Sequence, residues 1–347
     1  MSGENGARQH GPIVLVCAAD DTYAMPLAVT LYSALAHVRS GSEIRLYVLD
    51  GGISERNRAR LYHVCRSERV ALQIEWVRPD ASVLSGLEGC KWISPAAYLR
   101  LLIPDVVPEG LNKAIYLDCD LIVEADLAQL WEEEMGDQAV LAVRDFGVPY
   151  VSSRYGIRQY ADLGLSADQP YLNSGVLVMN LKRWREECVR EKVVQYVNAF
   201  REDLQFADQD GLNVVLAERW GMLEERWNVS PRLWRLDTSK RTGRDAAFRE
   251  ELGSMREEIL TQPHIFHFCG ASKPWHLRVT DGRDRVGAAE LRWVYYLRVS
   301  GWRGSFASAV WLMKWRLGRL WLTAKTRSRP HRNKLRQRMG KLVPQNA

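Results

Sequence analysis

Short, mostly apolar runs alternate with helix-like segments along the first 150 residues. Such runs, bounded by turn residues, are typical of buried strands, and they lie at residues 13–19, 43–49, 71–77, 114–117 and 139–143. Segments with helical spacing begin near Pro26 and at Ser54, and another covers residues 95–102. Strands that alternate with helices predict an α/β fold with a mostly parallel sheet and right-handed crossovers.

The second half of the chain continues this pattern less regularly. Residues 171–181 form an apolar run that Asn173-Ser-Gly175 interrupts, and glycine within a strand usually marks a bulge or the close approach of a ligand. The charged segment 182–201 predicts a solvated surface helix. A further helix is expected from about Asp208 to Trp220, and a last strand at residues 265–268.

The stretch from Lys113 to Asp120 carries the most informative chemistry. An apolar strand leads into Asp118 and Asp120, and their i, i+2 spacing places both carboxylates on one face of an extended chain. Leu117 and Cys119 then face the packed side. Open α/β sheets bind ligands at the carboxyl ends of their strands, where two carboxylates suit Mg²⁺ or Mn²⁺ carrying a phosphate. The alternative is a solvated strand end followed by a turn.

The turn after the first strand, Asp20-Asp21-Thr22, is acidic. No G-x-G-x-x-G follows this strand, which disfavours a dinucleotide-binding fold, and the carboxylates would repel a pyrophosphate. A carboxylate here suits a base, a ribose hydroxyl or the vicinity of a metal. Alternatively, Asp20 or Asp21 simply caps the following helix.

Two later stretches also offer binding chemistry. Asp208-Gln-Asp210 opens a predicted helix, where the carboxylates could merely cap and charge its N-terminus. Further on, His267 lies in a predicted strand, Gly270 allows the backbone near a ligand, and Lys273 is the only ammonium in the loop. This stretch provides an imidazole for a metal and a cation for a phosphate.

Composition indicates a globular chain with an uneven charge distribution. The 347 residues are 46% hydrophobic, which is enough for one large core or two smaller ones. Residues 301–347 hold 12 Lys or Arg and no Asp or Glu, whereas the preceding residues hold 36 basic and 42 acidic ones. The net charge of +6 therefore divides into −6 for the body and +12 for the tail. A body this acidic predicts no nucleic-acid partner.

The cysteines and the lengths of the apolar runs indicate where in the cell the protein is located. The six cysteines form no C-x-x-C pair, and several lie in apolar runs, which fits packed thiols in a reducing cytosol. Residues 1–11 lack the apolar run of a signal peptide, and no apolar run reaches the length of about 18 residues that spans a membrane. We therefore expect a cytoplasmic protein.

Five motifs in a fixed order carry a family resemblance. They are Val16-Cys-Ala-Ala-Asp-Asp21, Tyr116-Leu-Asp-Cys-Asp120, Asn173-Ser-Gly175, Asp208-Gln-Asp210 and His267-Phe-Cys-Gly-Ala-Ser-Lys-Pro-Trp275. Over residues 12–303 the chain resembles the family 8 glycosyltransferases, and most of all the bacterial lipopolysaccharide galactosyl- and glucosyltransferases. Glycogenin and plant galactinol synthase are similar at the same motifs. The resemblance implies a GT-A fold with a Rossmann-like nucleotide-sugar half at about 12–145 and an acceptor and catalytic half at about 146–303.

The resemblance also implies roles for individual residues. Asp118, Asp120 and His267 would hold a metal that bridges the diphosphate of a UDP-sugar; an imidazole ligand favours Mn²⁺, with Mg²⁺ as the alternative. The remaining positions implied to bind the donor are Asp20 and Thr22 at the nucleoside, Arg100, Asp145, Asn173 and Asp208 at the sugar, and Gly270 and Lys273 at the phosphates. Thr22 departs from the Asn common in the closest relatives. Gln209 matches the residue near the anomeric carbon, on the face opposite the leaving group.

The implied activity is transfer of galactose or glucose with retention of anomeric configuration. A divalent cation and Lys273 would stabilise the charge that develops on the leaving UDP. Gln209 is a weak nucleophile, so we favour front-face attack by the acceptor hydroxyl, with Asp208 as a covalent nucleophile as the alternative. A glycosidase pair of carboxylates is disfavoured, because the metal motif would then have no role.

Two other classes of protein remain open at this stage. A nucleotidyltransferase would also present paired aspartates to a metal and a nucleotide, but would release pyrophosphate. A non-catalytic membrane or nucleic-acid binding module would depend on the basic tail alone. The acceptor is expected to be a glycan, lipid-linked as in lipopolysaccharide core, or else a protein; residues 147–168 would line its groove or form a lid.

The basic tail, residues 304–347, predicts a membrane-associating segment. Its apolar stripe at helical spacing consists of Phe306, Val310, Met313, Leu317, Leu320 and Trp321. The tryptophans of this segment favour a headgroup boundary, and the cations favour anionic lipid. We therefore expect peripheral attachment to the inner face of the cell membrane. The alternatives are a helix that packs on the body and a nucleic-acid contact.

Overall fold

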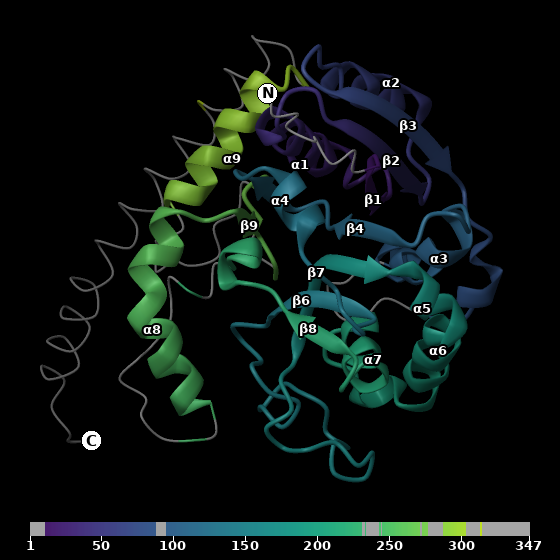
Figure 1. The fold of residues 1–347 in the computed structure, drawn as a ribbon, viewed down its shortest axis with the longest axis vertical. Coiled ribbons are helices and arrows are strands. Elements are labelled where there is room, and N and C mark those ends of the chain that lie inside the picture. Colours follow the sequence, from purple (N-terminus) through teal and green to yellow (C-terminus); the bar gives the residue numbers. More distant parts are fainter. Residues whose placement is uncertain are drawn as a thin grey trace, which may run out of the picture.

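The computed structural model describes residues 11–87, 95–230, 245–270, 273–276 and 287–302, together with residues 233, 243 and 313. Its centre is a seven-stranded sheet with the strand order β3-β2-β1-β4-β7-β6-β8 (Figure 1). The strands are β1 (Ile13–Ala19), β2 (Glu43–Asp50), β3 (Ala71–Val77), β4 (Lys113–Leu117), β6 (Val140–Arg144), β7 (Leu172–Asn180) and β8 (Trp220–Met222). Within this sheet only β7 runs against its neighbours. The predicted α/β class with a mostly parallel sheet is confirmed.

A second, two-stranded sheet joins distant parts of the chain. It pairs β5 (Leu121–Val123) with β9 (Ile265–His267) in antiparallel register, and Leu121 lies opposite His267. The amide of Phe268 also donates a hydrogen bond to the carbonyl oxygen of Asp120, at 2.9 Å. This pairing brings the end of β9 to the turn that follows β4.

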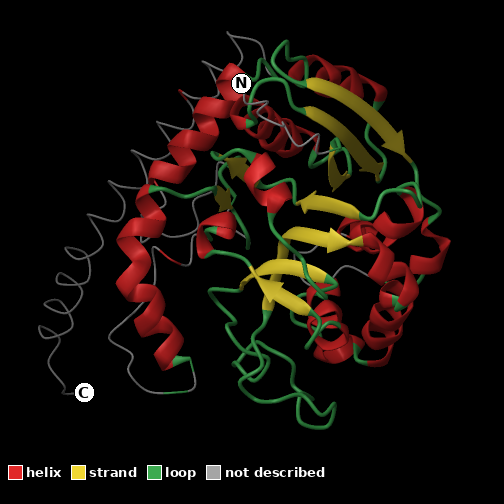
Figure 2. Cartoon of the chain, viewed as in Figure 1, coloured by secondary structure: helices red, strands yellow, loops and turns green. Residues whose placement is uncertain are grey.

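Helices cover both faces of the large sheet, as the cartoon in Figure 2 shows. On one face lie α1 (Ala24–His37), α2 (Glu55–Val64), α4 (Leu127–Glu132), α8 (Ala246–Thr261), α9 (Gly287–Val299) and the 3₁₀ turn η4 (Glu225–Asn228). On the other face lie α3 (Ile103–Val106), α5 (Leu181–Glu186), α6 (Val189–Ala199), α7 (Asp208–Val215) and the 3₁₀ helices η1 (Ala81–Leu84) and η2 (Pro95–Leu102). A short 3₁₀ turn, η3 (Arg201–Asp203), follows α6.

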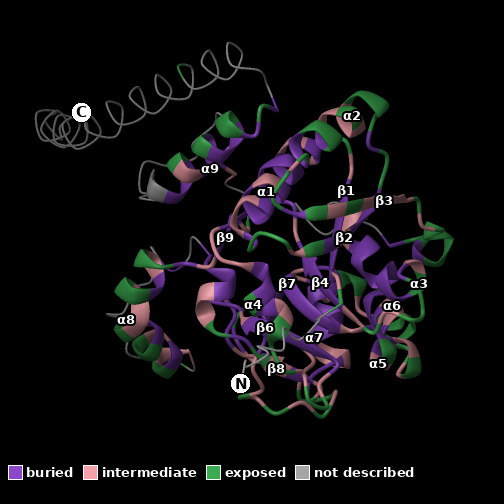
Figure 3. Cartoon of the chain, turned by 45° about the horizontal axis from the view of Figure 1, so that its top comes forward, coloured by how far each residue is buried: buried purple, intermediate pink, exposed green. Residues whose placement is uncertain are grey.

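The two cores follow the alternation of side chains along each strand. In β1, Leu15 and Cys17 belong to one core, while Val14 and Val16 belong to the other. Figure 3 shows the middle of the sheet as buried, whereas the edge strand β3 is intermediate to exposed. The expectation that Leu117 faces the packed side is confirmed, because its side chain is fully buried in the first core.

The prediction of one solvated helix over residues 182–201 is wrong in two respects. Cys188, in the left-handed conformation with φ 51°, separates α5 from α6. Trp184 and Val193 are buried in the second core, so this segment packs against the sheet and α7. Lysine, arginine and glutamate on the outer side hide the narrow apolar stripe in the sequence.

Most of the other differences between the predicted and the observed secondary structure occur at short elements. The helix expected to reach Trp220 ends at Val215, and Trp220 begins β8. Residues 95–102 form a 3₁₀ helix instead of an α-helix. Three-residue strands such as β5 and β8 contain too few positions to show a period of two.

The predicted tail helix falls outside the described residues, except for Met313. None of the helices in the described part of the chain is both long and apolar enough to cross a membrane.

Candidate active site

Polar and charged side chains line a pocket at the strand ends. The carboxyl ends of β1, β4 and β6 meet there with the start of the antiparallel β7, as expected for the ligand crevice of an open α/β sheet. The cavity volume is about 220 Å³. The sequence-predicted residues that line it are Asp20, Arg100, Asp118, Asp120, Asp145, Asn173, Asp208, Gln209, His267, Gly270 and Lys273. Thr22 is exposed and is not part of the lining.

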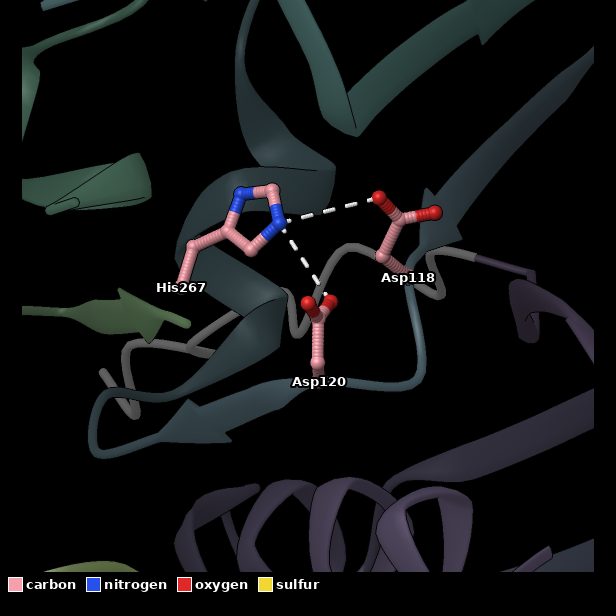
Figure 4. Close-up of side chains that lie close together, drawn as sticks. All are labelled: Asp118, Asp120 and His267. Carbon is pink, nitrogen blue, oxygen red and sulfur yellow. Dashed lines mark ion pairs between the residues drawn. The ribbon is translucent and has the colours of Figure 1, made fainter. Parts of the chain in front are cut away.

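Asp118, Asp120 and His267 converge in this pocket (Figure 4). Asp118 follows β4, Asp120 precedes β5, and His267 ends β9, so the small sheet sets their relative positions. Nε2 of His267 lies 3.3 Å from Oδ1 of Asp120 and 3.7 Å from Oδ2 of Asp118. Metal–ligand distances of about 2.0–2.2 Å place neighbouring ligand atoms roughly 3 Å apart, so these separations fit one divalent cation with little rearrangement.

Gly175 explains why a glycine interrupts the apolar run of β7. A Cβ atom there would lie 2.2 Å from Cε1 of His267 and 3.0 Å from Oδ2 of Asp118. The backbone of β7 therefore passes directly beside the metal-ligand set, and only glycine leaves room for the imidazole. This is the close approach that a glycine within a strand indicates.

The other side of the imidazole contacts Asn228, a residue that the sequence did not single out. Oδ1 of Asn228 lies 2.9 Å from Nδ1 of His267. Nδ2 of Asn228 donates to Oδ1 of Asn173, and Nδ2 of Asn173 donates to Oδ2 of Asp145. The predicted sugar-binding and metal-binding residues thus share one buried network. An asparagine in a 3₁₀ turn carries no motif that would have revealed it.

Lys273 supplies positive charge next to the ligand set. Its ammonium pairs with Asp120 and donates to the carbonyl oxygen of Phe268. Burial alone would raise the pKa of Asp120, but the ammonium of Lys273 and, when it is protonated, the imidazole of His267 hold that pKa well below its ordinary value. Asp120 therefore remains a carboxylate, which is the form that binds a cation.

Arg100 connects the remaining carboxylates. This buried guanidinium lies 3.3 Å from Asp118 and 2.9 Å from Asp208, and it stacks over the ring of Tyr116 at 4.9 Å. Its Nη1 also donates to the carbonyl oxygen of Ser174, at 2.6 Å. One rigid side chain thus connects β4, β7 and α7 at the base of the pocket.

Asp208 and Asp210 do more than cap and charge the N-terminus of α7. The residue before α7, Ala207, makes no side-chain cap, and both aspartates are buried. Oδ2 of Asp210 instead accepts hydrogen bonds from the amides of Gln205 and Phe206, which fixes the chain before the helix. Asp208 lies in the pocket, and its Oδ2 has no aligned hydrogen bond, although Arg100 is near.

Ser174, the residue between Asn173 and Gly175, holds the side chain of Gln209 in place. Oε1 of Gln209 accepts hydrogen bonds from the amide and hydroxyl of Ser174, at 2.9 and 3.1 Å. The same hydroxyl accepts from Arg100. Ser174 therefore positions both the guanidinium and the amide, a role that its sequence position between two motif residues did not reveal.

The two carboxylates of the acidic turn after β1, Asp20 and Asp21, make different contacts. Oδ1 of Asp20 accepts from the amide of Tyr23 at 3.1 Å, and Asp20 also faces the pocket. Asp21 instead accepts from the amide of Ser54 and the side chain of Asn57, at the start of α2. Neither caps α1 by the predicted side-chain bond, because the N-cap of α1 is Tyr23.

The segment 147–168 is folded around a small core of its own. Val148, Val151, Ile157 and Tyr171 are buried together. Among the described residues, none of this segment lines the pocket. Ser153 donates to Asp245 just before α8, at 2.8 Å, which ties the segment to a distant part of the chain.

The fold and site together define the class of protein: a GT-A type glycosyltransferase fold with an acidic, metal-compatible pocket at its strand ends. Among solved structures, the galactosyltransferase LgtC in complex with donor and acceptor sugar analogues superposes with a TM-score of 0.66 at 28% sequence identity, covering 83% of this chain and 96% of that one. The apo form of the glycosyltransferase GlyE from Streptococcus pneumoniae TIGR4, at 21% identity and a TM-score of 0.58, shares the fold; it covers 88% of this chain and 64% of that one.

Sequence comparison identifies the family. Glycosyl transferase family 8 matches residues 14–278. General stress protein A of Bacillus subtilis (strain 168) is 31% identical over 265 residues, which are 76% of this chain and 87% of that protein. A putative glycosyltransferase of Haemophilus influenzae is 24% identical over 278 residues, or 79% and 76% of the two chains. The chain belongs to glycosyltransferase family 8, and it is a glycosyltransferase.

We expect the substitution Gly175→Ala to weaken binding of a divalent cation by about 10-fold or more while leaving the fold intact. The new methyl group would displace the imidazole of His267 from its position beside Asp118. Binding can be measured by titrating Mn²⁺ and following the free ion by electron paramagnetic resonance. Gly110→Ala is the matched control, because no atom lies within 4 Å of its added Cβ. Equal affinity in both variants would refute the close-approach argument.

A pH-dependent stability difference should arise from Asp208. Burial raises its pKa from 3.8 to about 6, with Arg100 opposing and Asp118 adding to the shift. The folded chain therefore binds this proton more tightly than the unfolded chain, and the stabilisation is lost as the pH rises through about 6. Relative to Asp208→Asn, the wild type should lose about 3 kcal/mol of unfolding free energy between pH ~4 and ~8.

The measurement is urea unfolding of both chains in EDTA at the two pH values. All other titrating groups are present in both chains. The pH dependence of the difference between their free energies of unfolding therefore reports the titration of Asp208. Asp137→Asn, at an exposed position, controls for loss of a carboxylate. A difference that is independent of pH would show that Asp208 titrates normally.

Proposed function

We propose that this protein is a retaining hexosyltransferase that moves galactose or glucose from a UDP-sugar to a glycan acceptor, namely a lipid-linked saccharide such as lipopolysaccharide core. The observation that carries the proposal is the convergence of five separate motifs on one pocket. Asp118, Asp120 and His267 lie within bonding range of a single cation there. The likeness to a galactosyltransferase that binds donor and acceptor sugar analogues supports the same substrate classes.

Each group of pocket residues would contact one part of a UDP-sugar. Asp20 lies on the β1 side and would contact the nucleoside, while Lys273 and Gly270 would contact the diphosphate. Asp208, Asp145 and Arg100, which also line the pocket, would hold the hydroxyl groups of the hexose. A bound divalent cation would neutralise the diphosphate and stabilise the departing UDP.

The metal is proposed to be Mn²⁺, with Mg²⁺ as a possible substitute. Two carboxylates alone would suit either ion, but an imidazole ligand favours the softer Mn²⁺. Lys273 pairs with Asp120 in this structure. When the diphosphate binds, the ammonium is well placed to leave Asp120 for a phosphate oxygen, because charge-assisted contacts with both partners are comparable.

Front-face attack by the acceptor hydroxyl is the retaining mechanism that we favour. Gln209 is a feeble nucleophile, and its Oε1 already accepts two hydrogen bonds from Ser174. Attack by that oxygen would require both bonds to break. Gln209 would instead hold its amide toward the reacting face, and the departing phosphate would accept the proton of the acceptor hydroxyl. Asp208 remains the alternative nucleophile for a covalent route.

Incubation with a panel of UDP-sugars tests this function. With Mn²⁺ and no acceptor, we expect slow release of UDP from UDP-galactose or UDP-glucose, no release of pyrophosphate, and loss of the reaction in EDTA. Asp118→Asn combined with Asp120→Asn should abolish it, whereas Asp137→Asn, on the exposed surface, should not. Release of pyrophosphate would point to a nucleotidyltransferase, and full activity in EDTA would exclude the metal site.

We further propose that residues 304–347 attach the enzyme to anionic lipid on the inner face of the cell membrane. Twelve basic residues and no acidic ones lie in residues 301–347, and each basic residue near an anionic surface contributes about 1 kcal/mol. Attachment would place the active site beside a lipid-linked acceptor.

Cosedimentation with vesicles checks the tail. The full chain should pellet with phosphatidylglycerol vesicles at low salt and remain in solution at high salt or with neutral vesicles. A chain that ends near Arg303 should not pellet. If the shortened chain pellets equally well, another surface is the attachment site.

A further inference from the structure

Three hydrogen bonds, through the side chains of Asn173 and Asn228, link the carboxylate of Asp145 to the imidazole of His267. The distances along this relay are 2.8 Å from Asp145 to Asn173, 2.9 Å from Asn173 to Asn228, and 2.9 Å from Asn228 to His267. Every member is buried, and His267 and Asn228 are only 4% and 3% exposed. Because water has little access, each donor and acceptor must be satisfied within the relay.

The carboxylate of Asp145, at the first position of the relay, fixes which group donates and which accepts in each hydrogen bond. A carboxylate such as that of Asp145 only accepts, and its Oδ1 is already taken by the amides of Gly147 and Val148. The amide group of Asn173 must therefore point its Nδ2 at Oδ2 of Asp145. Independently, the backbone amide of Gly175 donates to Oδ1 of Asn173, at 3.0 Å. Both neighbours require the same orientation of Asn173.

That orientation determines the proton position on His267. Since Oδ1 of Asn173 accepts, Asn228 must present its Nδ2 to it and its Oδ1 to the ring. The Nδ1 atom of His267 then has to donate. Nε2 lies 3.3 Å from Asp120 and 3.7 Å from Asp118, but neither contact is aligned as a hydrogen bond, whereas Nδ1 lies 2.9 Å from Oδ1 of Asn228. A neutral ring therefore carries its single proton on Nδ1. The Nε2 lone pair is left facing Asp118 and Asp120, where a metal would lie.

The backbone around Asn228 is held firmly enough to impose this order. The amide of Val229 donates to the carbonyl oxygen of Ile265, and the amide of His267 donates to the carbonyl oxygen of Val229. These bonds join the end of η4 to β9 as a short parallel bridge between Val229 and Phe266. The side chains of Asn228 and His267 therefore have a fixed spacing.

We propose that Asn228 is a positioning residue that selects the metal-binding tautomer of His267. The inference rests on the proposed metal site and deepens it, because it names the residue that prepares the third ligand. An imidazole that carries its proton on Nε2 would have to lose it, or rotate, before it could bind a cation. Partners of a ligating histidine typically change metal affinity by about 10- to 100-fold.

The tautomer of His267 can be determined by NMR spectroscopy, without an assay of enzyme activity. The full-length chain is labelled with ¹⁵N-histidine, freed of metal, and studied by long-range ¹H–¹⁵N correlation at a pH of about 9, where an ordinary imidazole is neutral. The signals of His267 are assigned by their loss in His267→Gln. The wild type should show the proton on Nδ1, and Asn228→Leu should move it to Nε2.

Metal affinity and a conservative variant complete the test. Asn228→Leu should bind Mn²⁺ about 10- to 100-fold more weakly. Asn228→Asp retains an acceptor for Nδ1 and should keep the proton there. Asn213→Leu is the matched control: Asn213 is equally buried and bonds to the backbone of Leu172, but it lies outside the relay. It should leave both the tautomer and the affinity unchanged.

The outcomes separate this inference from the proposed function. A wild-type ring protonated on Nε2, or an unchanged tautomer in Asn228→Leu, overturns the role of Asn228 even if Mn²⁺ binds. A tautomer that depends on Asn228 in a chain that binds no Mn²⁺ would sustain the relay and reject the metal. If Asn228→Leu does not fold, the wild-type and Asn228→Asp spectra still decide the question.

Discussion

Repulsion among buried and half-buried carboxylates is the constraint on which the pocket depends. Asp118, Asp120, Asp145 and Asp208 approach one another at the strand ends, where water cannot screen them fully. Arg100 bridges two of them, Lys273 and His267 face a third, and backbone and side-chain amides satisfy the fourth. Burial, opposed by Arg100 and reinforced by Asp118, still raises the pKa of Asp208 to about 6. A divalent cation is the partner that such an arrangement favours.

The antiparallel strand β7 and the small sheet of β5 and β9 make this concentration of charge possible. A purely parallel sheet would present only carboxyl ends at the pocket, each followed by a helix. Because β7 runs the other way, its first residues, Asn173 to Gly175, reach the same place. The β5–β9 pairing then delivers His267, which lies 147 positions after Asp120 in the numbering, to a distance of 3.3 Å.

Much of the fold could be predicted, because long strands buried on both faces are continuous apolar runs. The strand at residues 13–19, which is buried throughout, has the predicted bounds. The edge strand at residues 71–77 also has the predicted bounds, although it is only partly buried. The errors fall where the pattern is short or masked by charge. β8 has three residues, and the buried stripe of α6 is narrow and flanked by lysine, arginine and glutamate. In both places packing against the sheet decides the structure, and local propensity does not.

The sequence by itself determined the chemistry of this protein: which side chains carry charge, which motif offers metal ligands, and which family the ordered motifs resemble. Only the tertiary structure decided how those groups are held. Ser174 and Asn228 have no distinguishing pattern, because their roles consist of hydrogen bonds to residues 35 and 39 positions away. The direction of a hydrogen bond depends on every partner in its network, and a linear sequence does not record which partners meet.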